Sequence, residues 1–289
     1  MTPPGLLSSL KEATADAPTV TYSVNSRGYT IDGKRYRRVT GLVGGGIPKP
    51  ALLPWGIKSV AEYAYEHRDV WSQLPKSDAI KALKQAPYTI RDDAGDRGTA
   101  IHKTLEALLG NTPMPQDLNE DEQACADSAL DFLAQRDSTH LATELTVFNN
   151  TVGYAGTLDL WEMDKDGVLW ILDYKTSQSG VFPNMAIQQI AYQRAEFALV
   201  KAKPIPGQKA SEAKVIPWGP QYAQRLGIVH VLPTGATLYP IRDPEGLMPV
   251  LQSAILIKQW LDDTDTFRGR VPREHVYEDP ITFKELTDE

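Results

Sequence analysis

Residues 156–177 read GTLDLWEMDKDGVLWILDYKTS, and this stretch decides the fold. Segments 155–163 and 168–175 are rich in aromatic and branched residues, and Asp-Lys-Asp-Gly separates them, as in two strands joined by a turn. The second segment is apolar on both faces until Asp173, which is typical of a strand in the middle of a covered sheet. The sequence therefore predicts an antiparallel hairpin at the centre of a sheet.

The turn of this hairpin predicts which residues face each other. If residues 165–167 form a three-residue loop with Gly167 in the left-handed conformation, Asp159 lies opposite Asp173. Side chains at directly opposed positions have Cβ atoms roughly 5 Å apart, and two like charges there destabilise the pair. The hairpin therefore needs a positive charge between its two aspartates.

Two kinds of positive charge are available to this pair. Lys175 shares a face with Asp173, because residues two apart on a strand point to the same side. It is, however, a single charge on a mobile stem. Carboxylate oxygens suit hard ions such as Mg²⁺ or Mn²⁺, which also accept phosphate oxygens as ligands. We therefore expect a divalent metal site beside Lys175.

Four separated motifs resemble, in order, those of the PD-(D/E)XK nuclease superfamily in its RecB-like exonuclease form. They are RGTAIH (97–102), GTLDL (156–160), LDYKTS (172–177) and the pair Gln188 and Tyr192. The resemblance covers residues 95–200 and, more loosely, 39–41 and Trp55. It implies an α/β fold with a restriction-endonuclease-like core, in which helices flank a mixed central β-sheet in the order αβββαβ.

The resemblance also implies a role for each matching residue. It implies metal ligation by His102, Asp159, Asp173 and the backbone carbonyl of Tyr174, catalysis by Lys175 with Asp159 and Asp173, and positioning of substrate or of Lys175 by Gln188 and Tyr192. One or two Mg²⁺ or Mn²⁺ ions would be bound. Each motif alone also has an ordinary interpretation, such as a helix pair of His102 with Glu106.

Glu144 resembles an acid that such domains carry on their first core strand. A simple hairpin through residues 149–153 would place Glu144 and Asp159 on opposite faces of the sheet. We therefore expect Glu144 to reach the metal only if a bulge shifts the register.

The single cysteine, Cys125, excludes an intramolecular disulfide and a thiolate-held zinc or iron–sulfur cluster. The properties of those superfamily branches that depend on an iron–sulfur cluster therefore do not transfer to this chain. The chain looks more like the compact, cluster-free nucleases of this type found in bacteriophages.

Hydrophobic periodicity predicts the remaining elements. Helices are expected over 53–67, 96–110, 120–136, 184–200 and 244–261, and strands over 141–148, 226–232 and 236–241. Residues 19–42 suit a small antiparallel sheet, and 44–50 suit a loop. We expect three regions: an N-terminal β-hairpin and helical lobe (1–94) packed as an elaboration on the nuclease core (95–262), and an acidic C-terminal tail (263–289).

The chain has a net charge of −7, so its overall charge does not attract nucleic acid. Any contact with nucleic acid must therefore come from local basic patches. One candidate is a basic stretch, 201–225, that also holds Trp218 and Tyr222; its expected substrate-binding lysines are Lys201, Lys203, Lys209 and Lys214. Aromatic rings stack on bases and cations meet phosphates, so the stretch could grip a strand. It could equally be a surface insertion.

The N-terminal residues lack the basic and apolar regions of a signal peptide, and no apolar run reaches the length needed to span a bilayer. We expect no membrane association and a location in the cytoplasm of a bacterium or a phage-infected cell.

These residues predict a Mg²⁺- or Mn²⁺-dependent DNA nuclease, with an exonuclease of DNA recombination, repair or phage DNA processing as the leading interpretation. The substrate would be single- or double-stranded DNA. Two alternatives stay open: a non-cleaving nucleic-acid-binding or regulatory subunit built on the same fold, and a nuclease that needs a helicase or annealing partner from recombination. No P-loop motif is present in the sequence.

Overall fold

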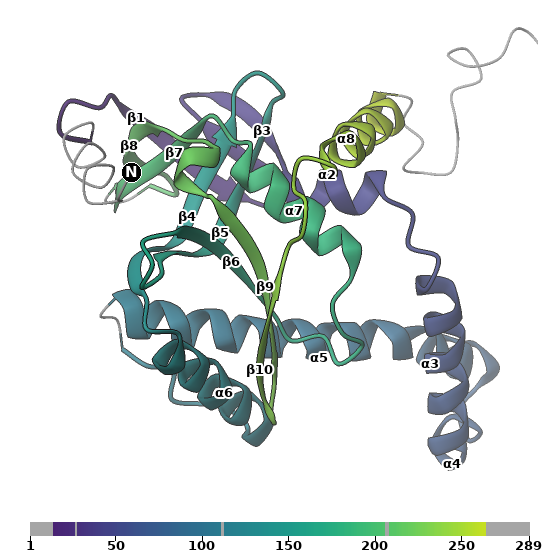
Figure 1. Ribbon diagram of the computed structural model, residues 1–289. Helices are drawn as coiled ribbons and strands as arrows, with labels where there is room; N and C mark the ends of the chain where they lie inside the picture. The colour runs from purple at the N-terminus through teal and green to yellow at the C-terminus, as the bar shows by residue number, and fades with distance from the viewer. Residues whose placement is uncertain (1–13, 27, 111–112, 206–207, 264–289) are drawn as a thin grey trace, which may run out of the picture.

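The computed structural model describes residues 14–26, 28–110, 113–205 and 208–263 (Figure 1). Its strands form one mixed sheet in the order β10-β9-β6-β5-β3-β2-β1-β8-β7-β4. The strands are β1 (Thr19–Asn25), β2 (Gly28–Ile31), β3 (Lys34–Arg38), β4 (Thr139–Asn149), β5 (Tyr154–Met163), β6 (Leu169–Lys175), β7 (Phe197–Pro204), β8 (Ser211–Pro217), β9 (Arg225–Leu232) and β10 (Gly235–Pro240).

The helices among the described residues are α2 (Val39–Gly46), α3 (Leu52–Glu66), α4 (Arg68–Trp71), α5 (Lys76–Gly110), α6 (Glu120–Arg136), α7 (Pro183–Gln193), the 3₁₀ turn η1 (Pro220–Tyr222) and α8 (Met248–Asp263). The chain thus has a mixed α/β fold, as the sequence predicts. None of the described helices combines the length and the apolar composition required to cross a lipid bilayer.

Seven strands of the sheet close into a ring, because β4 pairs with β5 as well as with β7. The N-terminal strands complete the ring: β3 runs parallel to β5, and β1 pairs with β8. The antiparallel strands expected over residues 19–42 are present as β1 to β3, but they belong to the central sheet and do not form a small sheet of their own. Residues from all seven strands pack together inside the ring, including Tyr29, Tyr36 and Phe148.

The open part of the sheet is covered on both faces, which explains why β6 is apolar on both faces until Asp173. Its residues Leu169 and Ile171 share a cluster with Ile187 and Ile190 of α7. The intervening Trp170 and Leu172 share a second cluster with Ile101 of α5 and with residues of α6. In Figure 1, α7, α2 and α8 accordingly lie on one side of these strands and α5 and α6 on the other. The predicted central, covered strand is confirmed.

The hairpin of β5 and β6 has the predicted register. Leu160 pairs with Leu172, so the next positions outward, Asp159 and Asp173, are opposed. Gly167 has a φ of 80°, in the left-handed region that the three-residue loop requires. The aspartates therefore meet at the end of the hairpin that faces away from its turn.

The expected helix over 184–200 is too long, since α7 ends at Gln193 and residues 197–204 form β7. The basic stretch that follows is also not a loop: β7 and β8 form an antiparallel pair within the ring. Apolar positions such as Ala198 and Ile216 are buried there, and this long-range pairing overrides the local Pro and Lys content.

Three helical expectations also need correction. The loop expected over 44–50 is occupied up to Gly46 by α2. The helix expected from 96 is the second half of α5, which begins at Lys76. The helix expected over 53–67 is present as α3, which begins and ends one residue earlier, at Leu52 and Glu66. The helix over 120–136 is confirmed, and the acidic tail lies outside the described residues.

Candidate metal centre

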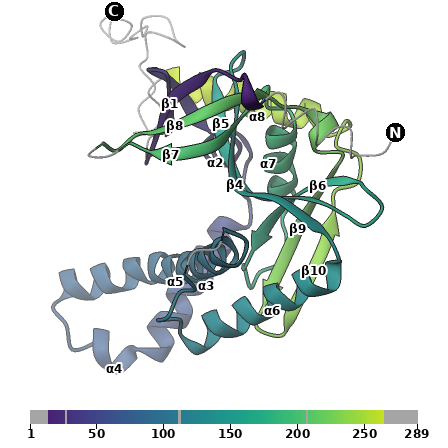
Figure 2. The ribbon, with the colours of Figure 1, turned by 90° about the vertical axis from the view of Figure 1, so that its left-hand side faces the viewer.

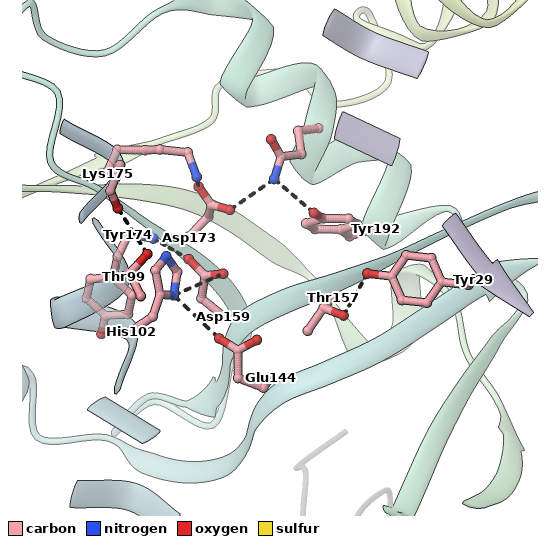
Figure 3. Close-up of polar contacts among 12 residues, drawn as sticks. Tyr29, Thr99, His102, Glu144, Thr157, Asp159, Asp173, Tyr174, Lys175 and Tyr192 are labelled. Atoms are coloured by element: carbon pink, nitrogen blue, oxygen red, sulfur yellow. Dashed lines mark hydrogen bonds and ion pairs between the residues drawn. The ribbon is translucent and has the colours of Figure 1, made fainter. Parts of the chain in front are cut away.

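Polar side chains from five elements meet where β6 ends, between α5 and α7 (Figure 3). They are His102 of α5, Glu144 of β4, Asp159 of β5, Asp173 and Lys175 of β6, and Gln188 of α7. The structure thus brings together residues that lie as far as 86 positions apart in the sequence, at 102 and 188.

His102, Glu144 and Asp159 form the innermost group. Nδ1 of His102 lies 3.4 Å from Oε1 of Glu144 and 3.7 Å from Oδ1 of Asp159. One ligand atom from each of the three lies within 4.8 Å of the others, close enough for a single ion to be held between them. We refer to these three residues as the ligand cluster.

The expectation that Glu144 needs a bulge to reach this position is wrong. Thr143 pairs with Leu160 and Leu145 with Leu158, so Glu144 lies directly opposite Asp159. The register differs from the expected one because the turn spans residues 150–153, with Asn149 paired to Tyr154. The one irregularity in the register of this pair lies upstream, between His140 and Ala142.

The backbone of Glu144 is strained, since its φ of 49° lies in the left-handed region that long side chains rarely adopt. Strain of this kind costs on the order of 1 kcal/mol and concentrates at functional sites. Its carboxylate is also held beside that of Asp159, which adds repulsion. Both features are unfavourable for stability, so they point to a role for Glu144 in binding.

We expect Glu144→Asn to change stability and metal binding in opposite directions. Asparagine tolerates the left-handed conformation and carries no charge, so the melting temperature of the metal-free protein should rise. The loss of a carboxylate ligand should weaken Mn²⁺ binding at least about tenfold, as measured by calorimetry. Glu144→Gln is the matched control, because it removes the charge and keeps the strain. Wild-type Mn²⁺ affinity in both variants would contradict a role for Glu144 as a ligand.

Asp159 is fixed by the backbone of the neighbouring strand. Its Oδ2 accepts a hydrogen bond of 2.7 Å from the backbone N–H of Tyr174. Burial, and then the negative charge of Asp173, raise the pKa of Asp159, although His102, Lys175 and the Tyr174 N–H act in the opposite direction. A bound cation would remove this conflict, because it would favour the charged form of both carboxylates.

Asp173 lies beside the ligand cluster rather than within it. Its carboxylate is 1% exposed, forms an ion pair with Lys175 and accepts a hydrogen bond of 3.2 Å from Nε2 of Gln188. Burial lowers the pKa of Lys175, but the charges of Asp173 and Asp159 outweigh it and raise the pKa above its ordinary value. Lys175 is therefore protonated at neutral pH and can act as a hydrogen-bond donor, not as a base.

Gln188 and Tyr192 are one turn apart on α7, as the sequence predicts. Nε2 of Gln188 donates to the hydroxyl of Tyr192 at 2.8 Å as well as to Asp173. Tyr192 is 2% exposed, and burial raises its pKa well above the ordinary value, so its hydroxyl stays neutral. In this structure the pair holds Asp173, which in turn holds Lys175, and the buried Tyr192 faces no open surface.

Two residues of the basic stretch 201–225, which was expected to grip a nucleic-acid strand, have partners within the protein instead. Trp218 is buried, lies 5.1 Å from Trp161 between ring centroids and donates to the carbonyl of Tyr192. Lys214 donates to the carbonyl of Ala17, so it is engaged with the backbone. Lys209 is exposed, whereas nothing is described of the side chains of Lys201 and Lys203.

Two residues near the centre were not predicted. The hydroxyl of Tyr29 lies 2.9 Å from that of Thr157, which shares a strand face with Asp159 (Figure 3). The position of Thr157, two residues before Asp159, could have indicated this. Tyr29 carries no such signal, because only closure of the strand ring brings it here.

No protein-family model matches this chain, and no curated protein matches it in sequence. Its chemistry must therefore be inferred from the ligand cluster and the lysine beside it.

Proposed function

We propose that this protein is a divalent-metal-dependent nuclease that hydrolyses phosphodiester bonds in DNA. The observation that carries the proposal is the meeting of His102, Glu144 and Asp159 next to a lysine that is paired with a buried aspartate. The order α6, β4, β5, β6, α7 also suits a restriction-endonuclease-like core, and the motifs resemble those of the PD-(D/E)XK superfamily.

The residues present fit a hard divalent ion. The cluster offers carboxylate oxygens and one imidazole nitrogen, a donor set that Mg²⁺ and Mn²⁺ accept and that lacks the thiolates of structural zinc sites. His102, Glu144 and Asp159 would hold the ion, and Asp173 could join them by turning from Lys175. The backbone carbonyl of Tyr174, adjacent to Asp173, is the further proposed ligand.

A bound ion would supply positive charge to the phosphate and acidify a water molecule. The other steps belong to the protein. Lys175 would donate a hydrogen bond to a phosphate oxygen on which negative charge develops. Asp173 keeps Lys175 protonated and in place, and Gln188 fixes Asp173. The Tyr174 N–H orients Asp159 toward His102, so the ligand cluster is arranged before substrate binds.

The proposal is tested with purified protein, Mn²⁺ or Mg²⁺, and DNA of three kinds: linear single-stranded, linear duplex and covalently closed circular. We expect degradation of linear DNA and none in EDTA. If closed circles are spared, the enzyme is an exonuclease; if they are cut, it is an endonuclease. Intact DNA of all three kinds at every metal concentration would contradict the proposal.

A further inference from the structure

A helical arm extends away from the sheet beside the metal centre (Figure 2). It consists of α3, α4 and the first half of α5, and many of its large apolar side chains are open to solvent. Leu53 is 73% exposed, Ile57 63% and Tyr88 51%. Exposed apolar surface gathered in one region is typical of a binding surface.

The arm contains a groove between α3 and α5. A hollow of about 600 Å³ is lined by Trp55 and Ile57 from α3 and by Lys84, Tyr88 and Arg91 from α5, among others. A second hollow of about 400 Å³ shares Lys84 and Tyr88 with the first. The guanidinium of Arg91 lies 5.2 Å from the centroid of the Tyr88 ring.

The charged residues that line the two hollows are all basic. They are Lys81, Lys84 and Arg91. Arg91 is ion-paired with Asp92 at 2.6 Å, so among the described lining residues the two lysines carry the unpaired positive charge. The chain as a whole has a net charge of −7, so this local balance is the reverse of the overall one. A groove that combines aromatic rings with cations only is complementary to a polyanion that carries flat, apolar faces.

The groove is aligned with the metal centre along α5. Lys84, Tyr88 and Arg91 precede His102 by 18, 14 and 11 residues, which is about five, four and three turns of an α-helix. The four side chains therefore lie on one side of α5, over a length of roughly 27 Å. Gly95 lies between them, and a Cβ built on it would meet no described atom within 4 Å.

We propose that this groove binds a single strand of nucleic acid and leads it along α5 to the metal centre, a proposal that rests on the proposed function. Bases of an unpaired strand can stack on Tyr88 while Lys81 and Lys84 meet its phosphates. A duplex hides the faces of its bases, so the groove selects unpaired strands. If the nucleotides are spaced 3.4 Å apart, as along one strand of a duplex, about eight of them span the distance from Lys84 to His102.

The other occupant to consider is a second copy of the chain. A twofold interface through this groove would bring the basic lining of one copy against that of the other, and like charges placed together oppose association. The charge of the groove therefore favours nucleic acid over a second copy of the chain as its occupant. The test below includes the oligomeric state, so that self-association through the groove would be detected.

The test measures the affinity of the full chain for fluorescein-labelled dT15 by anisotropy in EDTA, where no cleavage occurs. We expect Tyr88→Ala to weaken binding about fivefold or more, the effect of one lost stacked base. Lys84→Gln should also weaken binding and should reduce the slope of log K against log salt by about 0.7. Circular dichroism checks that both variants keep the helical content of the wild type.

Two matched controls lie on the same arm outside the groove. Tyr65 is 88% exposed, and Lys58 pairs with Glu62, so Tyr65→Ala and Lys58→Gln should bind dT15 like the wild type. Equal affinity of Tyr88→Ala and Tyr65→Ala would overturn the proposal. So would undetectable dT15 binding by the wild type, or a wild-type dimer that Tyr88→Ala dissociates without altering its affinity for dT15.

Failure of this proposal is distinguishable from failure of the proposed function. A wild type that binds dT15 through Tyr88 but cleaves no DNA with Mn²⁺ would contradict the nuclease alone. A wild type that cleaves DNA while Tyr88→Ala binds dT15 normally would contradict the groove alone.

Discussion

Lys175→Met should lower the rate of DNA cleavage about 100- to 1,000-fold, the usual effect of losing one donor that stabilises developing charge. The ammonium group of Lys175 is held against Asp173, so its position is defined before substrate arrives. Methionine keeps an unbranched apolar stem of similar length and removes the ammonium group with its charge and its N–H donors. The measurement is the single-turnover rate on linear DNA with Mn²⁺.

Lys165→Met is the matched control, because Lys165 is an exposed lysine in the turn of the same hairpin. It should cleave DNA at the wild-type rate. Mn²⁺ binding separates the role of Lys175 from that of a ligand: Lys175→Met should bind Mn²⁺ at least as tightly as the wild type, since a nearby positive charge is lost. Cleavage by Lys175→Met within a few-fold of the wild-type rate would refute its catalytic role.

Mn²⁺ should bind about 50-fold more weakly at pH 6 than at pH 8. Burial lowers the pKa of His102, but its hydrogen bond to Glu144 and the charges of Asp159, Glu144 and Asp173 outweigh this and raise the pKa to about 8. A protonated imidazole cannot ligate a metal, so the ion competes with a proton that is about 99% bound at pH 6 and half bound at pH 8.

Calorimetric titration of the wild type with Mn²⁺ between pH 6 and pH 8 measures this dependence. His102→Gln should bind more weakly at pH 8 and show a smaller change with pH. His67→Gln is the control, because His67 ends α3 on the helical arm and stacks on Tyr63. Affinity that is constant over this range would show that His102 is not a ligand.

The raised pKa values of His102 and Asp159 also imply that the stability of the metal-free protein depends on pH. A histidine whose pKa is raised by folding adds stability below its unfolded pKa of about 6.5, and this is lost as the pH rises through about 8. Asp159, whose pKa is also raised, acts in the same direction, because its charged form is the unfavourable one in the folded protein. The metal-free protein should therefore become less stable as the pH rises toward 8. The gain in stability on adding Mn²⁺ should become larger over the same range.

The sequence could predict the part of the site that local patterns determine. Alternation along residues 155–175 and the glycine at 167 were enough to oppose Asp159 and Asp173, because a hairpin register depends on its own turn. The one-turn spacing of Gln188 and Tyr192 likewise placed both on one helix face.

The features that were missed depend on distant parts of the chain. The register of Glu144 depends on the turn at 150–153, whose length its Asn, Thr and Gly residues do not define. Residues 197–204 and 211–217 form strands because β4 and β1 pair with them, not because of their own composition. The first half of α5 has too weak an apolar stripe to be recognised, and Pro87 lies within it.

Closure of the strand ring has a consequence for the behaviour of the protein at high concentration. Among the described strands, β10 is the one bonded to a single neighbour, and it is six residues long and ends at Pro240, which has no N–H to offer. Exposed edge strands can pair with the edge strands of other molecules and so start aggregation. An open ten-stranded sheet has two edge strands. The described part of this sheet has one, which is short and ends in proline, and this disfavours the growth of fibrous aggregates from the folded state.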